Sequence, residues 1–577
     1  QPDLVITYSI KPNIYMGSVC KAKGIPYVTN VQGLGTAFEK PVLSNVVSVM
    51  YRSALRKART VFFENEENAQ FFLHKNIISA QQMKVLPGAG INLDEYPYGF
   101  YSEDNFYKTE ADAESAVNYI YDAINYIEYS RSIVFLGDMN TDDMEPKGDA
   151  AAANKELDGW KINNFKTNTT LGNFYKYSYI TINRANAVIK KVPGMNIDEG
   201  RRNRFLGEAY FMRAYSYFNL ARNFGCVPVH TTPVETLEDT AVPAAESLDA
   251  MWKLVIEDFK TAGTLLPFFA APETGRADRA AAYGMLAKAY LYIASAKEHG
   301  VPQYAAMSHD VDEYYAEAVK YAGLVVDNPE QTVFRFDDNL LDIYDVERPA
   351  GPEHIFIMSM DRTGESEGQY SKISKMYLPY FSGATIYLKQ GDSDQMVPTH
   401  DGWGEYRTAL SFYDAFASGD RRHDWLIVDK VYDAAGNVVA STADGKLNYP
   451  FCRKFIDPNF SGDKTSTRPY LLRYSDVALT YAEAAGPTVK AYELVNFIRN
   501  RAGLGDLEPG LDKETFRERV MDERRFELAF EGNRCYDLRR WNRLHTDIAE
   551  AKGQGLSAEQ MVFYPIPSVE SDLNPNL

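Results

Sequence analysis

Cysteine is scarce in this chain and occurs in no metal-binding or redox pattern. Cys20, Cys226, Cys452 and Cys535 are spread over 577 residues, and none belongs to the CxxC pair that is typical of zinc and thiol–disulfide sites. So few cysteines also exclude a small fold held together by disulfides. Long apolar runs are missing as well, since none reaches the roughly 18 to 20 residues that a helix needs to cross a bilayer.

Positive charge is in deficit, and so are the short motifs of common enzymes. Lys and Arg number 61 against 79 Asp and Glu, a net charge of −18. A chain this acidic is poorly suited to a phosphate backbone, so we expect no nucleic-acid partner. No Gly-rich phosphate loop, HExxH motif or Ser-His-Asp elbow is present. The eight histidines form no ligand cluster, and we expect neither a metal site nor a cofactor.

Tyrosine is abundant, and charge is distributed unevenly. The chain has 40 Tyr against 31 Phe and 5 Trp, and a tyrosine combines a flat apolar ring with a hydrogen-bonding tip. The net charge is +3 over residues 1–98 and −21 over residues 99–577, and all five Trp lie in the second part. The length predicts two or more domains, and the change in composition places a boundary near residue 98.

Residues 1–98 alternate short apolar runs with helical stretches. Strands are expected near 4–7, 27–31, 60–63 and 84–87, with helices between them. This alternation is typical of a parallel sheet whose faces are covered by helices. The segment therefore predicts a small, partial α/β unit of the Rossmann-like type.

Residues 99–577 are predicted to be mainly α-helical. Apolar and aromatic residues recur there at three- and four-residue spacing. The pattern is typical of stacked helix pairs of the tetratricopeptide type, although no strict repeat of about 34 residues is present. The clearest helices are expected at 205–224, 277–297, 311–326, 471–485 and 516–530.

The stretch of about 333–462 interrupts this helical pattern. It is rich in Gly, Pro, Asp and aromatic residues, and it holds strand-like runs such as HIFIM at 354–358. A structureless loop of this length is uncommon inside a compact domain. We interpret the stretch as a large irregular insertion, a ligand-binding subdomain built on the helical frame.

Six sequence blocks, in order along residues 99–577, resemble those of a known protein family. They include FLGEAYFMRAY at 205–215, ERRFELAFEGNR at 523–534 and YPIP at 564–567. Together they resemble the SusD/RagB family, the surface glycan-binding lipoproteins of Bacteroidetes-type uptake systems. The resemblance implies an outer-membrane, surface-exposed protein that binds oligosaccharide without catalysis and delivers it to a SusC-like TonB-dependent transporter. The other blocks lie at 102–113, 275–291 and 473–504.

Charged residues within these blocks could be mistaken for acid–base machinery. Their helical spacing instead predicts ion pairs and caps that lock one helix to another, because buried charges require partners whatever the function. The residues concerned are Glu208, Arg213, Arg473, Asp476, Glu523, Arg524 and Glu531.

Two irregular stretches are candidates for the ligand site. A sugar ring has an apolar face and a rim of hydroxyl groups, so its site needs flat aromatic platforms with polar groups around them. The first stretch, 138–160, places a Trp in a loop rich in Gly and Asp; the second, 376–406, interleaves aromatic and polar residues without helical period. The expected ligand residues are Trp160, Tyr377, Tyr380, Phe381, Tyr387 and Trp403, with Asp138, Asp142, Asp394 and Gln395 as hydrogen-bonding partners.

Each of these aromatic residues has an alternative interpretation as a core side chain beneath a long loop. The acidic residues could also hold Ca²⁺ through oxygen ligands, but no EF-hand spacing is present. Trp252, Trp425 and Trp541 lie in or beside helical patterns, and we expect them in the core.

Residues 1–98 resemble a different protein family. KPNIY at 11–15, GIPYV at 24–28, NVQGLGTAF at 30–38, FFENEEN at 62–68 and LPGAGIN at 86–92 resemble the acceptor-side domain of a family-four glycosyltransferase. The opening strand would precede Gln1, and the nucleotide-sugar domain does not follow. The sequence thus indicates an incomplete transferase fragment. We expect that its junction with residues 99–577 arose either by recombination or as a genuine fusion. A half domain of this kind is expected to expose apolar strand edges.

The sequence is compatible with three functions. The leading hypothesis is non-catalytic glycan binding for nutrient uptake at the outer membrane. A glycosyltransferase using a nucleotide sugar is the enzyme alternative, and it is judged inactive because half an acceptor domain cannot hold the donor phosphates. The third is a tetratricopeptide-type adaptor that binds peptides in a groove, against which the aromatic insertion counts.

Overall fold

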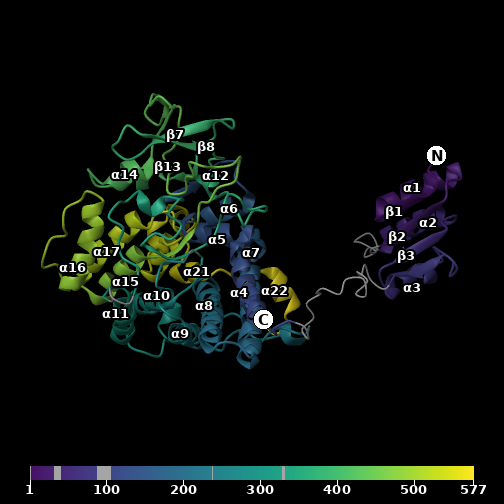
Figure 1. Cartoon of the computed structure of the whole chain (residues 1–577), viewed down its shortest axis with the longest axis horizontal. Coiled ribbons are helices and arrows are strands. Elements are labelled where there is room, and N and C mark those ends of the chain that lie inside the picture. The colour runs from purple at the N-terminus through teal and green to yellow at the C-terminus, as the bar shows by residue number, and fades with distance from the viewer. Residues whose placement is uncertain (1, 32–40, 87–105, 237, 274, 328–331) are drawn as a thin grey trace. The chain divides into compact units, whose positions relative to one another are not determined.

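The computed structural model describes residues 2–31, 41–86, 106–236, 238–273, 275–327 and 332–577. The chain divides into two compact units, Gln1–Asn105 and Phe106–Leu577 (Figure 1). The division lies close to the change of composition predicted near residue 98. Each unit has hydrophobic cores of its own.

The first unit is a small parallel α/β structure, as the alternating pattern predicts. Its sheet has the order β1-β2-β3-β4, and all three pairings are parallel. The elements are β1 (Val5–Tyr8), α1 (Ile10–Lys23), β2 (Tyr27–Val31), α2 (Pro41–Leu55), β3 (Thr60–Phe63), α3 (Glu66–His74) and β4 (Met83–Val85).

Strand β1 is an edge of this sheet and leaves apolar side chains uncovered. Ile6 and Tyr8 are each 53% exposed, and Leu4 just before the strand is 44% exposed. The expected exposure of an apolar edge is therefore confirmed. The Gly33-Leu34-Gly35 and Gly88–Asn92 segments of the glycosyltransferase resemblance lie outside the described residues.

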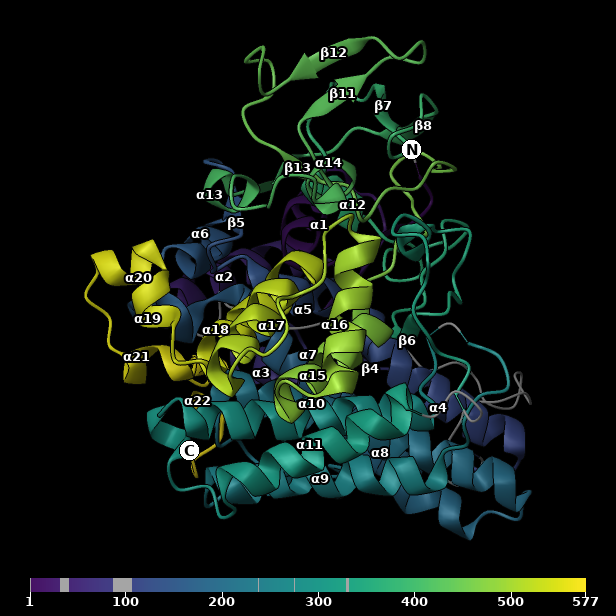
Figure 2. The same ribbon diagram turned by 90° about the vertical axis from the view of Figure 1, so that its left-hand side faces the viewer.

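The second unit is a stack of helices, and its long central helices pack against their neighbours in sequence. Helices α9, α10 and α11 run side by side in Figure 2. The helices of the frame are α4 (Glu110–Asn125), α5 (Ile127–Asp138), α6 (Ala152–Asp158), α7 (Thr169–Lys191), α8 (Glu199–Phe224), α9 (Leu248–Leu265), α10 (Arg279–Glu298), α11 (Val311–Val326), α15 (Tyr474–Ala485), α16 (Val489–Arg501), α17 (Lys513–Glu527), α18 (Arg534–Arg540), α19 (Leu544–Asp547), α20 (Ala549–Gly553), α21 (Ala558–Val562) and α22 (Ser568–Leu573).

Local sequence signals start several of these helices. Thr109 caps α4 in a reciprocal capping box with Asp112, and the side chains of Ser247 and Asp278 accept backbone N–H bonds at the starts of α9 and α10. Such caps satisfy N–H groups that have no partner within the helix. All five helices predicted from periodicity are present, and α11 has the predicted bounds.

The insertion at 333–462 is more ordered than an irregular loop, because it has a small core and a sheet. Strands β12-β11-β7-β8 form a four-stranded sheet over a core that includes Leu378, Leu388 and Phe451. The elements of this part and the strands that pair with it are β5 (Met144–Pro146), β6 (His354–Ile357), α12 (Ile373–Tyr377), β7 (Thr385–Lys389), β8 (Met396–His400), β9 (Tyr406–Thr408), α13 (Leu410–Tyr413), α14 (Arg421–Trp425), β10 (Ile427–Val428), β11 (Lys430–Tyr432), β12 (Val438–Ser441), β13 (Phe451–Cys452) and β14 (Tyr470–Arg473).

Buried ion pairs join the helical frame to the insertion. Arg473 contacts Glu353 and Glu531, each at 2.7 Å, and Arg422 contacts Glu523 at 2.6 Å. The structural interpretation of the charged blocks is confirmed for all seven residues: the remaining pairs include Arg213–Asp258 at 2.7 Å, Lys288–Asp476 at 2.6 Å, Arg524–Asp476 at 2.9 Å and Arg276–Glu208 at 2.8 Å.

Candidate functional site

Two exposed aromatic rings lie on backbone segments that are bonded to each other within the insertion. Tyr380 is 67% exposed and Trp403 is 37% exposed. The backbone N–H of Trp403 donates to the carbonyl of Lys375 at 2.6 Å, and the N–H of Gly404 donates to the carbonyl of Leu378 at 2.9 Å. We call Tyr380 and Trp403, with the half-buried Phe381 that packs against the small core of the insertion, the aromatic surface.

A single buried carboxylate fixes the turn that carries Tyr380 and Phe381. The carboxylate of Asp401 accepts the backbone N–H groups of Phe381 and Gly383, both at 2.8 Å. The ammonium of Lys375 lies 3.3 Å from the same carboxylate. These bonds hold the backbone of the turn in place, and the ring of Tyr380 that it carries is exposed.

Glycine is required where the two segments meet. A Cβ on Gly402 would lie 1.9 Å from the carbonyl oxygen of Leu378, which no real contact allows. Gly404 has a φ of 56°, in the left-handed region that glycine favours. The Gly-Trp-Gly run at 402–404 therefore allows the two backbone segments to approach closely.

Other members of the predicted site lie on the neighbouring hairpin of β7 and β8. Tyr387 is half-buried on β7, opposite Pro398 and Tyr432. Asp394 and Gln395 are exposed where the hairpin turns, and Asp394 lies 3.3 Å from the ammonium of Lys389. These polar groups are accessible to a ligand.

Trp160 is not part of an exposed site, contrary to the expectation from its Gly- and Asp-rich loop. It is 1% exposed, its indole N–H donates to the carbonyl of Asn140 at 3.1 Å, and its ring stacks on Tyr564 with the centroids 6.2 Å apart. The segment that covers it comes from the far end of the chain, so local composition could not reveal its burial.

Tyr377 is likewise a core residue. It is 1% exposed and packs against Phe455, with the ring centroids 5.3 Å apart. The structure thus separates it from Tyr380, only three positions later. Trp252 and Trp541 are buried as expected, whereas Trp425 is half-buried.

The two acidic residues of the first predicted stretch have structural partners. The carboxylate of Asp138 accepts backbone N–H bonds from Gly532, Asn533 and Arg534 at the start of α18. Burial raises the pKa of Asp138 to about 7. Burial alone would also raise the pKa of Asp142, but its bonds to Arg534, 2.8 and 2.9 Å long, leave that pKa below its ordinary value.

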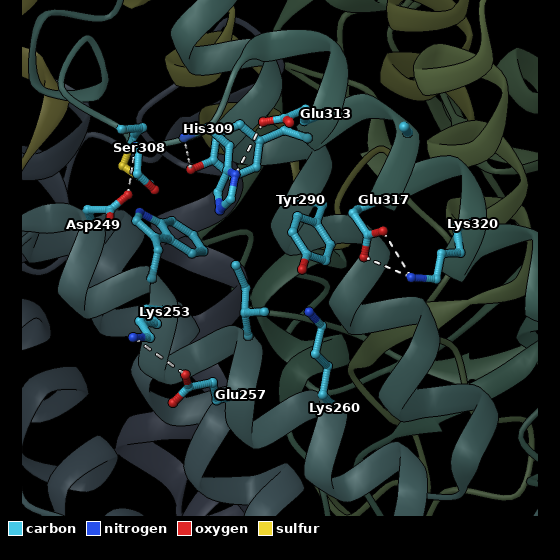
Figure 3. A pocket seen from close by; sticks show the side chains of 15 residues that line it. Asp249, Lys253, Glu257, Lys260, Tyr290, Ser308, His309, Glu313, Glu317 and Lys320 are labelled. Carbon is cyan, nitrogen blue, oxygen red and sulfur yellow. Dashed lines mark hydrogen bonds and ion pairs between the residues drawn. The ribbon is translucent and has the colours of Figure 1, made fainter.

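A large cavity lies on the helical frame, away from either predicted stretch. It has a volume of about 800 Å³ and lies along α9, α10 and α11 (Figure 3). Tyr290 and Trp252 contribute aromatic surface. Most of its charged side chains pair with one another, for example Lys320 with Glu317 at 2.9 Å and His309 with Glu313 at 3.2 Å.

Sequence reasoning did not find this cavity. Its polar residues are spaced as on the solvent-exposed face of an amphipathic helix. Such spacing is normally interpreted as an exposed helix face and not as a binding site. In the cavity, the ammonium of Lys260 lies 5.6 Å from the centre of the Tyr290 ring, which is a cation–π distance. In the parts of the chain that the structure describes, no group of three or more His, Cys, Asp or Glu residues could hold a metal ion.

Comparison with known families identifies the second unit. Residues 352–577 match the SusD family, and residues 94–291 match the family described as starch-binding associating with outer membrane. The second unit is SusD-like in sequence and in fold.

Curated relatives and solved structures agree with this assignment. SusD-like protein P2 of Formosa agariphila is 25% identical over 527 residues, covering 84% of this chain and 95% of the relative. A SusD homologue from Bacteroides thetaiotaomicron has a TM-score of 0.67 at 20% identity, covering 84% of this chain and 99% of its own. A laminarin-binding SusD-like protein has a TM-score of 0.65 at 24% identity, with coverage of 81% and 98%.

The expectation that this unit is not an enzyme agrees with these matches, since the family matched at residues 94–291 is described as starch-binding. The family matches begin at residue 94, so they give no support to the glycosyltransferase resemblance of residues 1–98. None of the helices within the described ranges is both long and apolar enough to span a membrane.

Proposed function

We propose that the SusD-like unit binds an oligosaccharide on its aromatic surface. The observation that carries the proposal is the pair of uncovered rings, Tyr380 and Trp403, held on segments that backbone hydrogen bonds join. An aromatic ring at a surface matches the apolar face of a sugar, and a backbone that is already held in place loses little conformational entropy on binding. Tyr387, Asp394 and Gln395 on the adjoining hairpin supply further contacts to ring and hydroxyl groups.

The relatives support a carbohydrate ligand. One solved neighbour is named as a laminarin-binding SusD-like protein. Another is surface glycan-binding protein A of Bacteroides thetaiotaomicron in complex with laminarihexaose, with a TM-score of 0.62, 20% identity, and coverage of 80% of this chain and 97% of its own. Laminarin-type glucans are therefore the first ligands to test.

Calorimetric titration of a panel of polysaccharides against the full chain tests the site. Trp403→Ala and Tyr380→Ala are each expected to weaken binding about tenfold or more, which corresponds to about 1.4 kcal/mol. Tyr119→Ala is the matched control, because Tyr119 is an exposed tyrosine of α4 on the helical frame, with 56% exposure. Affinity that is unchanged in both Trp403→Ala and Tyr380→Ala would rule out the aromatic surface as the site.

The proposed role includes delivery to a transporter at the outer membrane. The family description associates such proteins with the outer membrane, and the resemblance implies a SusC-like TonB-dependent transporter as partner. Co-purification of the tagged chain with a SusC-like protein from outer-membrane extracts would support this role. Recovery of the chain only from the soluble fraction, with no transporter bound, would contradict it.

A second candidate function, peptide binding on the helical frame, is favoured by the cavity of about 800 Å³ along α9, α10 and α11. Its paired charges and aromatic residues could receive an extended peptide. Display selection of peptides, followed by Tyr290→Ala and Lys260→Ala, would test it. Peptides whose binding is insensitive to both substitutions would remove this alternative.

A further inference from the structure

A buried arginine in the insertion has no acidic partner. Arg453 follows β13 and is 4% exposed. Its guanidinium donates to the side-chain oxygen of Gln390 at 2.7 Å and to the carbonyl of Trp425 at 3.4 Å. Within the described residues, no carboxylate forms an ion pair with it, and its Nε–H has no hydrogen-bond partner.

This arrangement differs from that of three other buried cations in the insertion and at its border, although Arg468 is also buried and, within the described residues, forms no ion pair. Arg422, Arg473 and Lys454 each lie within 2.8 Å of a carboxylate. A buried charge without a counter-charge is unfavourable, because desolvation is not offset by attraction. Burial lowers the pKa of Arg453 to about 10. The guanidinium therefore still carries its charge at neutral pH.

Arg453 lines a cavity of about 240 Å³ beside the β7–β8 hairpin. Apolar side chains, among them Met396, Pro398 and Ile456, form part of its wall, and the amides of Gln390 and Gln395 supply polar groups. An apolar wall with amides and a cation matches a sugar ring that has hydroxyl groups and an anionic substituent.

The lining of the cavity contains one carboxylate, and a second guanidinium, within the field of Asp361, Asp457 and Glu347, is bonded to the lining. Asp345 lines the cavity but is exposed, and its carboxylate accepts the backbone N–H of Glu347 at 3.0 Å. Arg468 is buried and donates to the carbonyl of Val346, another lining residue, at 3.0 Å. Positive charge therefore lies in the wall and negative charge at the exposed side.

We propose that this cavity is a subsite for an anionic sugar residue, with the Arg453 guanidinium binding its carboxylate or sulfate group. The proposal rests on the proposed glycan-binding function and adds to it a preference for oligosaccharides that carry an acidic residue. A bound anion would supply the counter-charge that the chain itself does not provide, and Gln390 would hold the guanidinium in position for it.

Titrations of the full chain with matched ligands test the subsite. The probes are an oligogalacturonate, a sulfated oligogalactan and a neutral oligogalactan of equal length. We expect the wild-type chain to bind at least one acidic probe about tenfold or more tightly than the neutral one, and Arg453→Gln to lose that preference. Arg453→Lys, which keeps the charge but not the planar fork, should retain part of it. The carboxylate and sulfate probes distinguish the two sources of the anion.

Arg407→Gln is the matched control. Arg407 is a half-buried arginine of β9 whose guanidinium lies 4.5 Å from the centre of the Tyr449 ring. Its substitution should leave the preference unchanged. Thermal unfolding without ligand checks that each variant is folded, and Gln390→Ala, which removes only the partner of Arg453, provides a second variant if Arg453→Gln does not fold.

The outcomes separate this inference from the proposed function. Equal affinity for acidic and neutral probes in the wild-type chain, or a preference that survives both Arg453→Gln and Gln390→Ala, would overturn the anionic subsite while the aromatic surface stands. Weaker binding of every probe by Trp403→Ala, together with loss of only the acidic preference in Arg453→Gln, is the result expected if both hold.

Discussion

At the scale of single residues, exposure decides which aromatic side chains can serve a ligand. Trp160 and Trp403 both occur in loops rich in Gly and Asp, yet one is 1% exposed and the other 37%. Trp160 is covered by Tyr564, whereas Trp403 is bonded through its backbone to α12. The same residue type in similar local sequence thus has two different roles.

Substitution of the two tryptophans should separate these roles. Trp160→Ala leaves a large cavity in the core and is expected to lower the free energy of unfolding by about 3 to 5 kcal/mol. Trp403→Ala removes a partly exposed ring and is expected to cost less than about 1 kcal/mol. Denaturant titrations of both variants measure the difference. Equal losses of stability would contradict the assignment of Trp403 to the surface.

The buried carboxyl of Asp138 should make stability depend on pH. Its pKa in the folded chain is about 7, raised by burial from an ordinary value of 3.8. Between about pH 4 and 7 the folded chain retains a proton that the unfolded chain releases, so this group lowers stability as pH rises, by roughly 1.4 kcal/mol per pH unit at most. Above pH 7 both forms are ionised and the slope ends.

Asp138→Asn isolates this contribution, because asparagine does not titrate and keeps one oxygen to accept N–H bonds from the start of α18. The difference in the free energy of unfolding between the Asp138→Asn variant and the wild-type chain, measured from pH 4 to 8, should change up to about pH 7 and then level off. A difference that is flat over the whole range would show that Asp138 is ionised in the folded chain.

At the scale of elements, helix periodicity predicted five helices of the frame, although α7 and α9 were not among them. The predicted range 311–326 became α11 without change, and 205–224 became the later part of α8. The helix predicted at 471–485 begins three residues late, because Tyr470–Arg473 forms β14 and pairs with β6. Pairing with a strand more than a hundred residues away overrides local helical spacing, and periodicity cannot detect it.

The buried ion pairs between elements should be sensitive to the loss of one member, because the partners that remain stay buried without a matching counter-charge. Arg473 of β14 contacts Glu353, Glu527 and Glu531. Arg473→Met leaves these carboxylates with too little counter-charge, and it is expected to lower the free energy of unfolding by about 3 to 5 kcal/mol.

Arg519→Met is the control for this substitution. Arg519 pairs with Asp522 on the surface of α17, where both side chains are more than half exposed, and such pairs contribute about 1 kcal/mol or less. Chemical denaturation of the two variants compares them. Equal small effects would show that the buried cluster tolerates the loss of a cation.

At the scale of the whole molecule, the chain consists of a SusD-like unit and a small α/β unit with an uncovered edge. Ile6 and Tyr8 on β1 are exposed, and an edge strand has unpaired backbone groups that can join another chain. In the second unit the edge strand β12 also exposes Val438 and Val439. The effects of the β1 edge should nevertheless be separable, because that edge belongs to the first unit and can be removed with it.

Removal of residues 1–105 should reduce aggregation and leave the unfolding transition of the SusD-like unit in place, because each unit has its own core. Light scattering and calorimetry of the full and shortened chains measure both effects. Ile6→Lys in the full chain should reduce aggregation as well, since a charge on an edge strand opposes pairing. Aggregation that persists after removal of residues 1–105 would place its cause in the second unit.

The sequence by itself determined the mainly helical frame, the boundary near residue 98, the structural role of the charged blocks and the location of Tyr380 and Trp403 in the insertion. These features depend on periodicity, composition and charge pairing, which are local or follow general rules of burial. Only the tertiary structure decided which aromatic rings stay uncovered, that Asp138 caps a distant helix, and that Arg453 faces a cavity without an acidic partner. Exposure and pairing depend on segments hundreds of residues apart, which sequence spacing does not encode.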